Sequence, residues 1–364
     1  MKVLVIGGSQ FNGLALVQQL VREAHEVTVL NRGRTEATIP EPVRRLTGDR
    51  TDPRRMRTLL GSEAFDCVYD MCAYHPSDVE MMTDLFRGRI GHYVFISSIA
   101  IYASSRVLPI AEDFPVDRGP NQNEYGLHKI QCEDHLLAEH DARGFPATTV
   151  VLPMVMGPRN IMPDREQRMF VRLQKGRPIL IPGDGTALSQ VGYVDDHAEA
   201  LCAIMGRPHT FGQRYNLTGP QFFSDEGYVD VMADVTGRQA EKVFIPAQLM
   251  DELWDGQIEA GRGRLTSRID IRASSVATDN STAQMQRWQL ATLVQKAQPN
   301  LHRWNQGLVL STEKLARDVG WRPRHSFREA VELTFEWFRQ QQRIDPTDFD
   351  FSFEDSILDL LRNG

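Results

Sequence analysis

The stretch KVLVIGGSQFNG, residues 2–13, decides the fold that this sequence predicts. An apolar strand leads directly into a turn that contains Gly7, Gly8 and Gly13, and apolar residues at helical spacing follow over residues 14–23. Glycines let a backbone approach a pyrophosphate closely, and the first amides of a helix are free to bind it. At the start of a strand–helix series, the turn predicts a dinucleotide site rather than an ordinary strand–helix connection.

Strands alternate with helical patterns through the first half of the chain. After the opening strand, β-like runs occupy residues 25–33, 43–50, 65–74, 92–102 and 148–158, and a long helix is expected from Glu124 to His140. Only crossover connections join parallel neighbours, and the near-continuous apolar character of these runs fits burial on both faces of a sheet. The sequence therefore predicts a Rossmann-like, doubly wound parallel α/β sheet.

A smaller C-terminal α/β substrate domain is expected to follow. We place the dinucleotide-binding domain at residues 1–175, with a returning segment near 187–217, and the substrate domain mainly at 176–364, including a polar helical insertion at about 251–306. Residues 176–201 are predicted to form a hairpin-like segment and then a helix capped by Asp195 and Asp196. The tail carries carboxylates and aromatics and is expected to end in a helix.

Composition and charge exclude several classes of protein. With 364 residues, 41% hydrophobic and 24% charged, the chain is ordinary for a soluble globular protein. Its formal net charge of -7 argues against a protein dominated by nucleic-acid phosphates. No apolar run approaches the roughly 20 residues of a membrane span, and no charged leader precedes the first strand, so we expect a cytoplasmic protein. Neither the histidines nor the cysteines have metal spacing, and Cys67, Cys72, Cys132 and Cys202 are expected to be buried free thiols.

The end of the second predicted strand concerns the choice of nucleotide. Sites that hold free ribose hydroxyls often place Asp or Glu there, whereas this chain has Asn31, Arg32 and Arg34. Arginine suits a ribose 2′-phosphate through charge-assisted contacts, although solvated surface arginines fit the pattern as well. NAD and NADP are therefore both candidates. Asp49, after the third strand, is expected to accept a hydrogen bond from the adenine amino group or only to cap the following turn.

A phenol and an ammonium are placed together further along the chain. Tyr125 and Lys129 are four residues apart, so a helix puts them on one face. The positive charge favours the phenolate and lowers the pKa of the tyrosine toward the working pH. Ser97 or Ser98, at the end of the fifth strand, can hydrogen-bond the same substrate oxygen. Such a pair is common on helix surfaces, but the glycine turn and the double serine that precede it favour a proton-transfer site.

With these features the chain resembles an extended short-chain dehydrogenase/reductase, of the NAD-dependent epimerase/dehydratase family. The matching stretches, which cover most of residues 1–340, are GGSQFNG, GDR, DMCAY, FISSIAIY, YGLHK, VLPMVMGPRN, GDGTALSQVGYVDDHAEA, YNLTGP and LARDVGWRPRHSFREAVELTFEWF. The resemblance implies that Tyr125 is the acid/base, that Lys129 binds the nicotinamide ribose, and that Ser98 orients the substrate hydroxyl. Combined with the motifs above, it predicts cofactor contacts at Gly7, Gly8, Gln10, Phe11, Asn12, Gly13, Asn31, Arg32, Arg34, Asp49, Arg50, Cys72, Ala73, Lys129, Pro153 and Val155.

The chain departs from the family pattern in the turn and in the substrate site. Gln10 replaces the usual middle glycine, as in an atypical GGTxFxG branch that includes chloroplast stem-loop-binding proteins. Met154 and the run Ser189-Gln190-Val191 stand where sugar-nucleotide epimerases often carry polar groups. Candidate anion contacts are instead Arg159, Asn160 and four arginines that also fit solvated helix faces, namely Arg262, Arg264, Arg268 and Arg272. His75 and Tyr102 are expected near the active-site mouth, as substrate contacts or as packing residues.

The reaction implied is oxidation of a carbinol by bound NAD(P)+, with Tyr125 taking the hydroxyl proton. We therefore predict a sugar or nucleotide-sugar epimerase, with tightly held NAD. The alternatives are a dehydratase, an NADPH-dependent keto-sugar reductase, and, of another class, a non-catalytic RNA-binding or regulatory protein on the same scaffold. The intact catalytic residues and the net negative charge disfavour RNA. A homodimer through the helix that begins near Tyr125 is usual in the family and is expected here.

Overall fold

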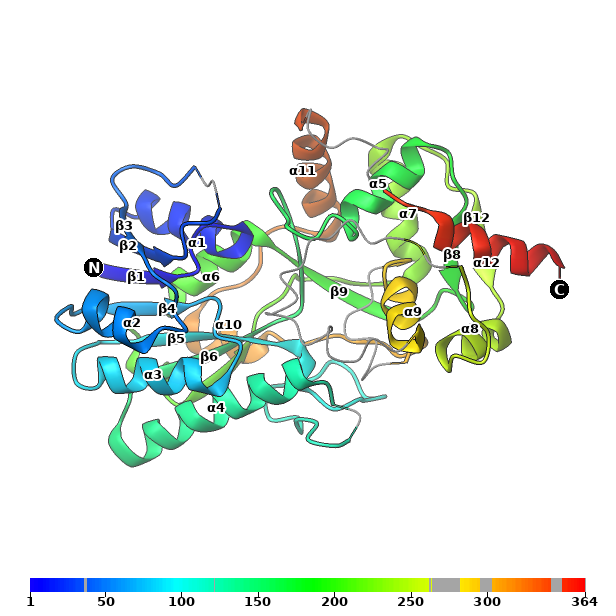
Figure 1. The fold of residues 1–364 in the computed structure, drawn as a ribbon. Coiled ribbons are helices and arrows are strands. Elements are labelled where there is room, and N and C mark those ends of the chain that lie inside the picture. Colours follow the sequence, from blue (N-terminus) through cyan, green and yellow to red (C-terminus); the bar gives the residue numbers. More distant parts are fainter. Residues whose placement is uncertain are drawn as a thin grey trace.

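A computed structural model describes residues 1–35, 38–120, 122–261, 263, 282–294, 303–341 and 349–363 (Figure 1). Its largest sheet has the order β10-β6-β5-β4-β1-β2-β3, and all neighbouring strands in it are parallel. The strands are β1 (Lys2–Ile6), β2 (Glu26–Asn31), β3 (Arg44–Thr47), β4 (Cys67–Asp70), β5 (Tyr93–Ser98), β6 (Ala147–Leu152) and β10 (Gln213–Asn216). The first six have the 3-2-1-4-5-6 order of a dinucleotide-binding sheet, so the predicted doubly wound fold is confirmed.

Helices cover both faces of this sheet because its strands are apolar on both sides. Helices α1 (Phe11–Arg22) and α6 (Val194–Ile204) pack on each other, and so do α3 (Pro76–Phe86) and α4 (Glu124–Arg143), with α2 (Pro53–Leu60) beside α3. Successive side chains of a strand point to opposite faces. In β1, Val3 and Val5 accordingly share a buried cluster with α1 and α6, whereas Leu4 and Ile6 share one with α2, α3 and α4.

Pro153 marks the place where the chain leaves the large sheet. The sequence predicts one strand over residues 148–158, and this is wrong at the proline, which has no N–H to donate to a ladder. Strand β6 ends one residue before it. The next strand, β7 (Met154–Met156), joins a second sheet of order β11-β9-β7, formed with β9 (Leu188–Tyr193) and β11 (Phe222–Ser224).

Two further local predictions are wrong. The segment 176–201 forms no hairpin, because β8 (Ile179–Pro182) pairs in parallel with β12 (Lys242–Ile245) and β9 pairs with β7 and β11. Asp195 and Asp196 do not cap α6, whose N-cap is Tyr193. The Asp196 carboxylate accepts instead from the backbone N–H groups of Arg324 and His325, both at 3.0 Å, and thus holds a segment that is distant in sequence.

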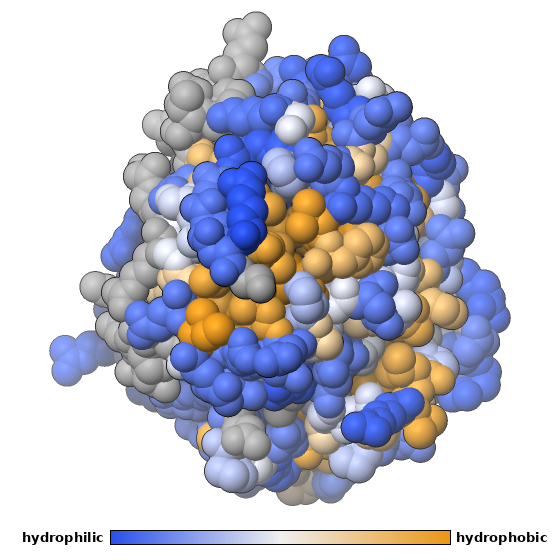
Figure 2. All heavy atoms as spheres, turned by 90° about the vertical axis from the view of Figure 1, so that its right-hand side faces the viewer, coloured by the Kyte–Doolittle hydropathy of each residue, from blue (hydrophilic) through white to orange (hydrophobic). Residues whose placement is uncertain are grey.

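The remaining elements surround the two small sheets. They are α5 (Glu166–Gln174), α7 (Asp225–Thr236), α8 (Ala247–Trp254), α9 (Thr282–Ala291), α10 (Glu313–Val319), α11 (Phe327–Gln340), α12 (Ser352–Asn363) and the 3-10 helices η1 (Ile99–Ile101) and η2 (Pro208–Thr210). One apolar cluster joins α5, α7 and α11, and another joins α8, α9 and α12. On the face that carries α8 and α12, apolar side chains gather near the middle amid hydrophilic ones (Figure 2). The proposed division near residue 175 stays a prediction, although β10 does return to the large sheet.

The described part of the chain contains no helix with the length and apolarity that a membrane span needs. All four cysteines are free thiols, three of them buried and Cys72 partly so.

Candidate active site and cofactor-binding turn

The turn between β1 and α1 is built so that only glycine fits at its closest approach. A Cβ on Gly13 would lie 2.2 Å from the carbonyl oxygen of Gly7, and Gly7 itself has a φ of 89°. The helix starts at Phe11, and its first internal hydrogen bond runs from the N–H of Leu14 to the oxygen of Gln10, at 3.1 Å. The preceding amides are therefore those that a helix N-terminus offers to an anion.

Asn12 and Phe11 give a direct test of whether this turn fits a dinucleotide. The Oδ1 atom of Asn12 is buried and has no hydrogen-bond partner in the described residues, so it is an acceptor suited to a hydroxyl of the ligand. Phe11 has a positive φ of 37°, an uncommon conformation for a bulky residue, while its side chain packs in a core cluster. Gln10 is exposed at the helix N-cap and makes no capping bond. The turn thus fits a pyrophosphate and its ribose.

Basic residues and one carboxylate meet at the ends of β2 and β3. Arg32 and Arg34 are exposed, and Asn31 accepts a hydrogen bond from the Gly33 N–H at 2.9 Å, which closes the turn between them. Hydrogen bonds from the N–H and hydroxyl of Thr51, helped by the two nearby guanidinium groups, hold the pKa of Asp49 below its usual range. The structure therefore brings these predicted cofactor contacts to one edge of the sheet.

Arg50 is used inside the fold rather than exposed for a ligand. Its guanidinium donates to both oxygens of the buried Asp70 carboxylate, at 2.5 and 2.9 Å, and lies 3.4 Å from Asp78. Burial raises the pKa of the Asp70 carboxyl, but Arg50 outweighs it and the pKa lies below its usual range. The same guanidinium lies 3.7 Å from Cys72 Sγ, and that atom would be 3.0 Å from a Cβ on Gly7. Arg50 therefore supports Cys72 against the glycine turn.

The two serines that end β5 have different partners. Ser97 donates its hydroxyl proton to the buried carboxylate of Glu133. Ser98 Oγ accepts from the backbone N–H of Ala100 at 3.3 Å, so its own proton is left for a ligand. This placement favours Ser98 over Ser97 as the residue that binds a substrate oxygen.

Lys129 is the most constrained cation near the end of β5. Its side chain is 2% exposed, and Nζ donates to the carbonyl oxygens of Ala73 and Ile96, at 2.7 Å each. Nζ lies 5.8 Å from the centre of the Tyr125 ring and 5.0 Å from that of Tyr74. Two of its three N–H groups are thus occupied, and the third has no acceptor within the described residues. Tyr125 itself is only partly buried, so its ring is open to a ligand.

Arg165 is a candidate that the sequence analysis missed. It is the N-cap of α5, and burial lowers the pKa of its guanidinium although Glu166, Tyr125 and Tyr228 favour the charged form. Its side chain has no hydrogen-bond acceptor among the described residues. Arg165 therefore adds a positive charge that acts on Tyr125 from a different helix, since Tyr125 lies in α4. No spacing in the sequence singles it out.

The predicted substrate contacts are placed unevenly. Arg159 is exposed with a φ of 64°, whereas Asn160 is buried and donates to Glu166 at 2.8 Å, which shapes the loop before α5. Tyr102 is fully buried, and its hydroxyl donates to Asn216 at 2.7 Å, which favours the packing alternative for this residue. His75 is the N-cap of α3, with its ring 4.7 Å from that of His128. Arg262, Arg264, Arg268 and Arg272 lie outside the described residues.

Pro153 and Val155, the last predicted cofactor contacts, flank the junction of the two sheets. Pro153 is partly exposed, and Val155 is buried in the same cluster as Phe11 of the glycine turn.

A cavity of about 510 Å³ lies elsewhere, between α4, β10 and α10, and it contains none of the predicted site residues. In its lining Arg214 pairs with Glu133 at 2.7 Å, and Asp134 pairs with Arg118 outside it, at 2.8 Å. In the described ranges, no group of His, Cys, Asp or Glu is arranged to hold a metal ion.

Comparisons with known proteins identify the family to which this chain is similar. Residues 3–218 match the NAD-dependent epimerase/dehydratase family. The chloroplast stem-loop binding protein of 41 kDa b from Arabidopsis thaliana is 30% identical over 65% of this chain, and the match spans 63% of that protein. A 2'-dehydrokanamycin reductase from Streptomyces kanamyceticus is 24% identical over 74% of this chain and 77% of its own. A UDP-glucose 4-epimerase from Streptomyces lividans is 26% identical over 69% and 85%.

Solved structures show the same fold at low identity. A dTDP-glucose 4,6-dehydratase from Bacillus anthracis, solved in complex with NAD, superposes with a TM-score of 0.69 at 14% identity. The superposition covers 96% of this chain and 99% of that one, so it includes the elements after residue 218.

Proposed function

The chain belongs to the NAD-dependent epimerase/dehydratase family, and from this premise we propose that it is an epimerase of a sugar or nucleotide sugar, with Tyr125 as its acid/base. Family membership confirms the resemblance that the motifs indicate, the class of enzyme, and NAD(P) as the cofactor. The substrate, the outcome of the reaction and the roles of individual residues are proposals.

The observation that carries the proposal is the buried ammonium of Lys129, 5.8 Å from the centre of the Tyr125 ring. It is held by two backbone carbonyls, so its charge cannot move away when the tyrosine loses its proton. A fixed positive charge stabilises a phenolate, and the phenolate is the form that accepts the proton of a substrate hydroxyl. The remaining N–H of Lys129 is suited to a ribose hydroxyl of the cofactor.

The cofactor would be held by the glycine turn, with the amides at the start of α1 on its pyrophosphate. When bound, a nicotinamide accepts a hydride from a carbinol carbon and returns it to a keto carbon. In this scheme Tyr125 takes the hydroxyl proton, Ser98 donates a hydrogen bond to the same oxygen, and Arg165 binds an anionic group of the substrate. After the keto sugar has rotated within the site, hydride return to the opposite face of its carbonyl carbon and return of the Tyr125 proton to its oxygen give the epimer.

A reductase is the second candidate, and Arg32 and Arg34 are the observation that favours it. Two exposed guanidinium groups at the end of β2 suit the 2′-phosphate of NADPH. Net reduction of a keto sugar would use the same proton on Tyr125 but would exchange the cofactor at each turnover. The similar chloroplast protein is named for stem-loop binding, but the intact catalytic residues and the net charge of -7 favour an enzyme here.

The test is to denature the purified protein, identify the released nucleotide by mass spectrometry, and screen nucleotide sugars for epimerisation. Retained NAD+ together with conversion of one nucleotide sugar to its epimer is the expected result. Easily exchanged NADP(H) with net reduction would support the reductase. Neither released nucleotide nor binding of NAD(H) or NADP(H) in titrations would overturn both. Retention on an RNA column that weakens steeply with salt would point to nucleic-acid binding instead.

A further inference from the structure

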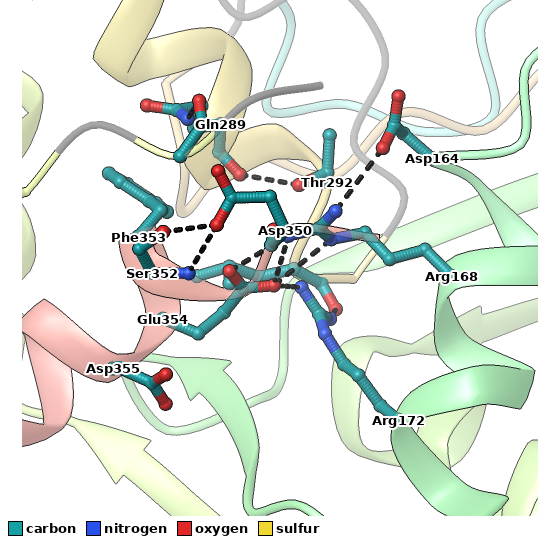
Figure 3. Close-up of polar contacts among 12 residues, drawn as sticks. Asp164, Arg168, Arg172, Gln289, Thr292, Asp350, Ser352, Phe353, Glu354 and Asp355 are labelled. Atoms are coloured by element: carbon teal, nitrogen blue, oxygen red, sulfur yellow. Dashed lines mark hydrogen bonds and ion pairs between the residues drawn. The ribbon is translucent and has the colours of Figure 1, made fainter. Parts of the chain in front are cut away.

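A cluster of buried charges lies where α5 meets the C-terminal segment (Figure 3). Arg168 and Arg172 of α5 are nearly inaccessible, with 2% of each side chain exposed. Glu354 of α12 reaches both. Arg168 Nε and Nη2 donate to it at 3.0 and 2.9 Å, and Arg172 Nη2 donates to the same carboxylate. Asp164 accepts from Arg168 Nη1 at 3.2 Å. We call Asp164, Arg168, Arg172 and Glu354 the α5 clasp; its two cations and two anions balance.

Two distant segments of the chain converge on the clasp. Arg172 Nη1 donates to the carbonyl of Leu293, just after α9, at 3.1 Å. Arg168 donates to the carbonyl of Asp350, and its Cζ lies 4.7 Å from the centre of the Phe351 ring. The clasp therefore ties α5 both to the polar insertion and to the tail, the two parts of the chain that the family motifs do not cover.

The N-terminal end of α5 leads to the candidate active site. Its N-cap is Arg165, whose charge interacts with Tyr125. Met169 and Phe170 of α5 belong to the same apolar cluster as Phe11, which lies in the glycine turn. Helix α5 thus carries the clasp arginines, follows Arg165, and packs in the apolar cluster that includes the glycine turn.

The charge of Glu354 is essential to this arrangement. Burial raises the pKa of its carboxyl, but Arg172 and Arg168 outweigh burial, so the pKa lies below its usual range and the group is ionised. Removing one partner from a buried ion cluster leaves an uncompensated charge in the interior and is strongly destabilising. For Arg168 and Arg172 we expect the helix that carries them, α5, to become less firmly held.

We propose that Glu354 is a positioning residue of the active site: by pairing with Arg168 and Arg172 it fixes α5, and through α5 it holds Arg165, the N-cap of that helix, in place. The inference rests on the proposed function, in which Arg165 binds an anionic group of the substrate. It gives the C-terminal segment a part in substrate binding although none of its residues is assigned to the site.

The test compares Glu354→Gln with Asp355→Asn in the full-length holoenzyme. Asp355 is the matched control, since it is the next carboxylate on α12 and pairs with Arg177 at the surface, with 53% of its side chain exposed. Hydrogen exchange of the α5 amides is measured first, and then KM and kcat for the nucleotide sugar that the wild type converts. We expect E354Q to speed exchange in α5 and to raise KM at least tenfold, with kcat and the cofactor dissociation constant within threefold. D355N should match the wild type throughout.

A merely structural role gives a different result. In that case E354Q lowers the amount of folded, cofactor-loaded protein, but the loaded fraction keeps the wild-type KM, and this outcome overturns the proposal. If E354Q does not fold, Glu354→Asp serves, since it keeps the charge and shortens the reach; an unchanged KM and unchanged α5 exchange would again overturn it. Faster α5 exchange in a protein whose wild type converts no sugar supports the clasp and contradicts the proposed function alone.

Discussion

Lys129 and Tyr125 share one face of α4, with Nζ of the lysine 5.8 Å from the centre of the tyrosine ring. The ammonium donates to the carbonyl oxygens of Ala73, just after β4, and Ile96, in β5. Two strand ends of the parallel sheet therefore fix a positive charge beside a partly exposed phenol. This arrangement, more than the spacing of the two residues in the sequence, favours proton transfer at Tyr125.

Replacing Lys129 by methionine should cost both activity and stability. The variant leaves the carbonyls of Ala73 and Ile96 without their buried donor. Each unsatisfied carbonyl should lower the free energy of unfolding by about 1–3 kcal/mol. It also removes the charge that stabilises the phenolate, so we expect kcat to fall roughly 100-fold or more. Denaturant unfolding and steady-state kinetics measure the two effects. Lys2→Met, which removes a surface ion pair with Glu63, is the control, and equal kinetics for the two variants would contradict the assigned role.

Gly13→Ala should abolish cofactor binding. The added Cβ would stand 2.2 Å from the carbonyl oxygen of Gly7, a distance that only a displaced turn can relieve. At Gly88, which has a φ of 70° and nothing within 4 Å, the same substitution meets open space and costs only about 1 kcal/mol for the backbone conformation. Titration of NAD(H) and NADP(H) by calorimetry compares the two. Wild-type affinity in G13A would show that the turn does not approach the nucleotide.

The double variant Arg32→Ser/Arg34→Ser should discriminate between the two nucleotides. Charge-assisted hydrogen bonds contribute about 1.5–3 kcal/mol each, so loss of both guanidinium groups should weaken NADP(H) at least tenfold. Binding of NAD(H), which lacks the 2′-phosphate, should change less than threefold. Arg22→Ser, on the last turn of α1, is the control for a general loss of positive charge. Equal weakening of both nucleotides would exclude a contact specific to the 2′-phosphate.

His92 should make the fold sensitive to acid. Its Nε2 lies 2.8 Å from the Thr148 hydroxyl, which itself donates to Thr210, and its Nδ1 accepts from the Gly206 N–H, so the buried ring is neutral. Burial lowers the pKa of His92 to about 3, against about 6.5 in the unfolded chain. The unfolded state therefore binds the extra proton as the pH falls through this window. The free energy of unfolding should therefore decrease as the pH falls from 6.5 toward 3, by up to about 1.4 kcal/mol per pH unit.

The free energy of unfolding as a function of pH, measured for His92→Gln, checks this expectation. Glutamine does not titrate, so the variant should be less stable at neutral pH but show a shallower decline on acidification. His209→Gln removes an exposed histidine and should keep the wild-type slope. A wild-type slope in H92Q would mean that other groups cause the acid sensitivity.

The parts of the fold that the sequence predicts are those with a local cause. The glycine turn, the apolar strands and the helix that carries Tyr125 and Lys129 follow from residue patterns within short windows. The prediction of a hairpin at 176–201 was wrong because β8 pairs with β12, some sixty residues later in the chain. No residue pattern in either strand indicates this pairing. The prediction of one continuous strand across Pro153 was also wrong, although a proline inside such a run is itself a signal that the strand ends there.

The candidate site residues divide in the same way, into those that a local pattern indicates and those whose contacts come from distant parts of the chain. Arg50, Tyr102 and Asn160 carry the residue types of a binding site, but tertiary contacts with Asp70, Asn216 and Glu166 use their polar groups within the fold. Arg165 was missed because Tyr125, with which its charge interacts, is 40 residues earlier in the chain, and no local pattern links the two. The partners of Arg168 and Arg172 lie in α12, so the clasp could not be read from either segment alone.

The most direct measurement compares Tyr125→Phe with Tyr74→Phe in conversion of the nucleotide sugar. Each variant loses one hydroxyl from one of two neighbouring rings, whose centres are 6.2 Å apart, and Lys129 faces both. The account predicts that Y125F binds the cofactor normally but loses roughly 100- to 10,000-fold in kcat, as expected for removal of a general acid/base, while Y74F stays within a few-fold of the wild type. Wild-type kcat in Y125F would contradict the central claim that this tyrosine moves the proton.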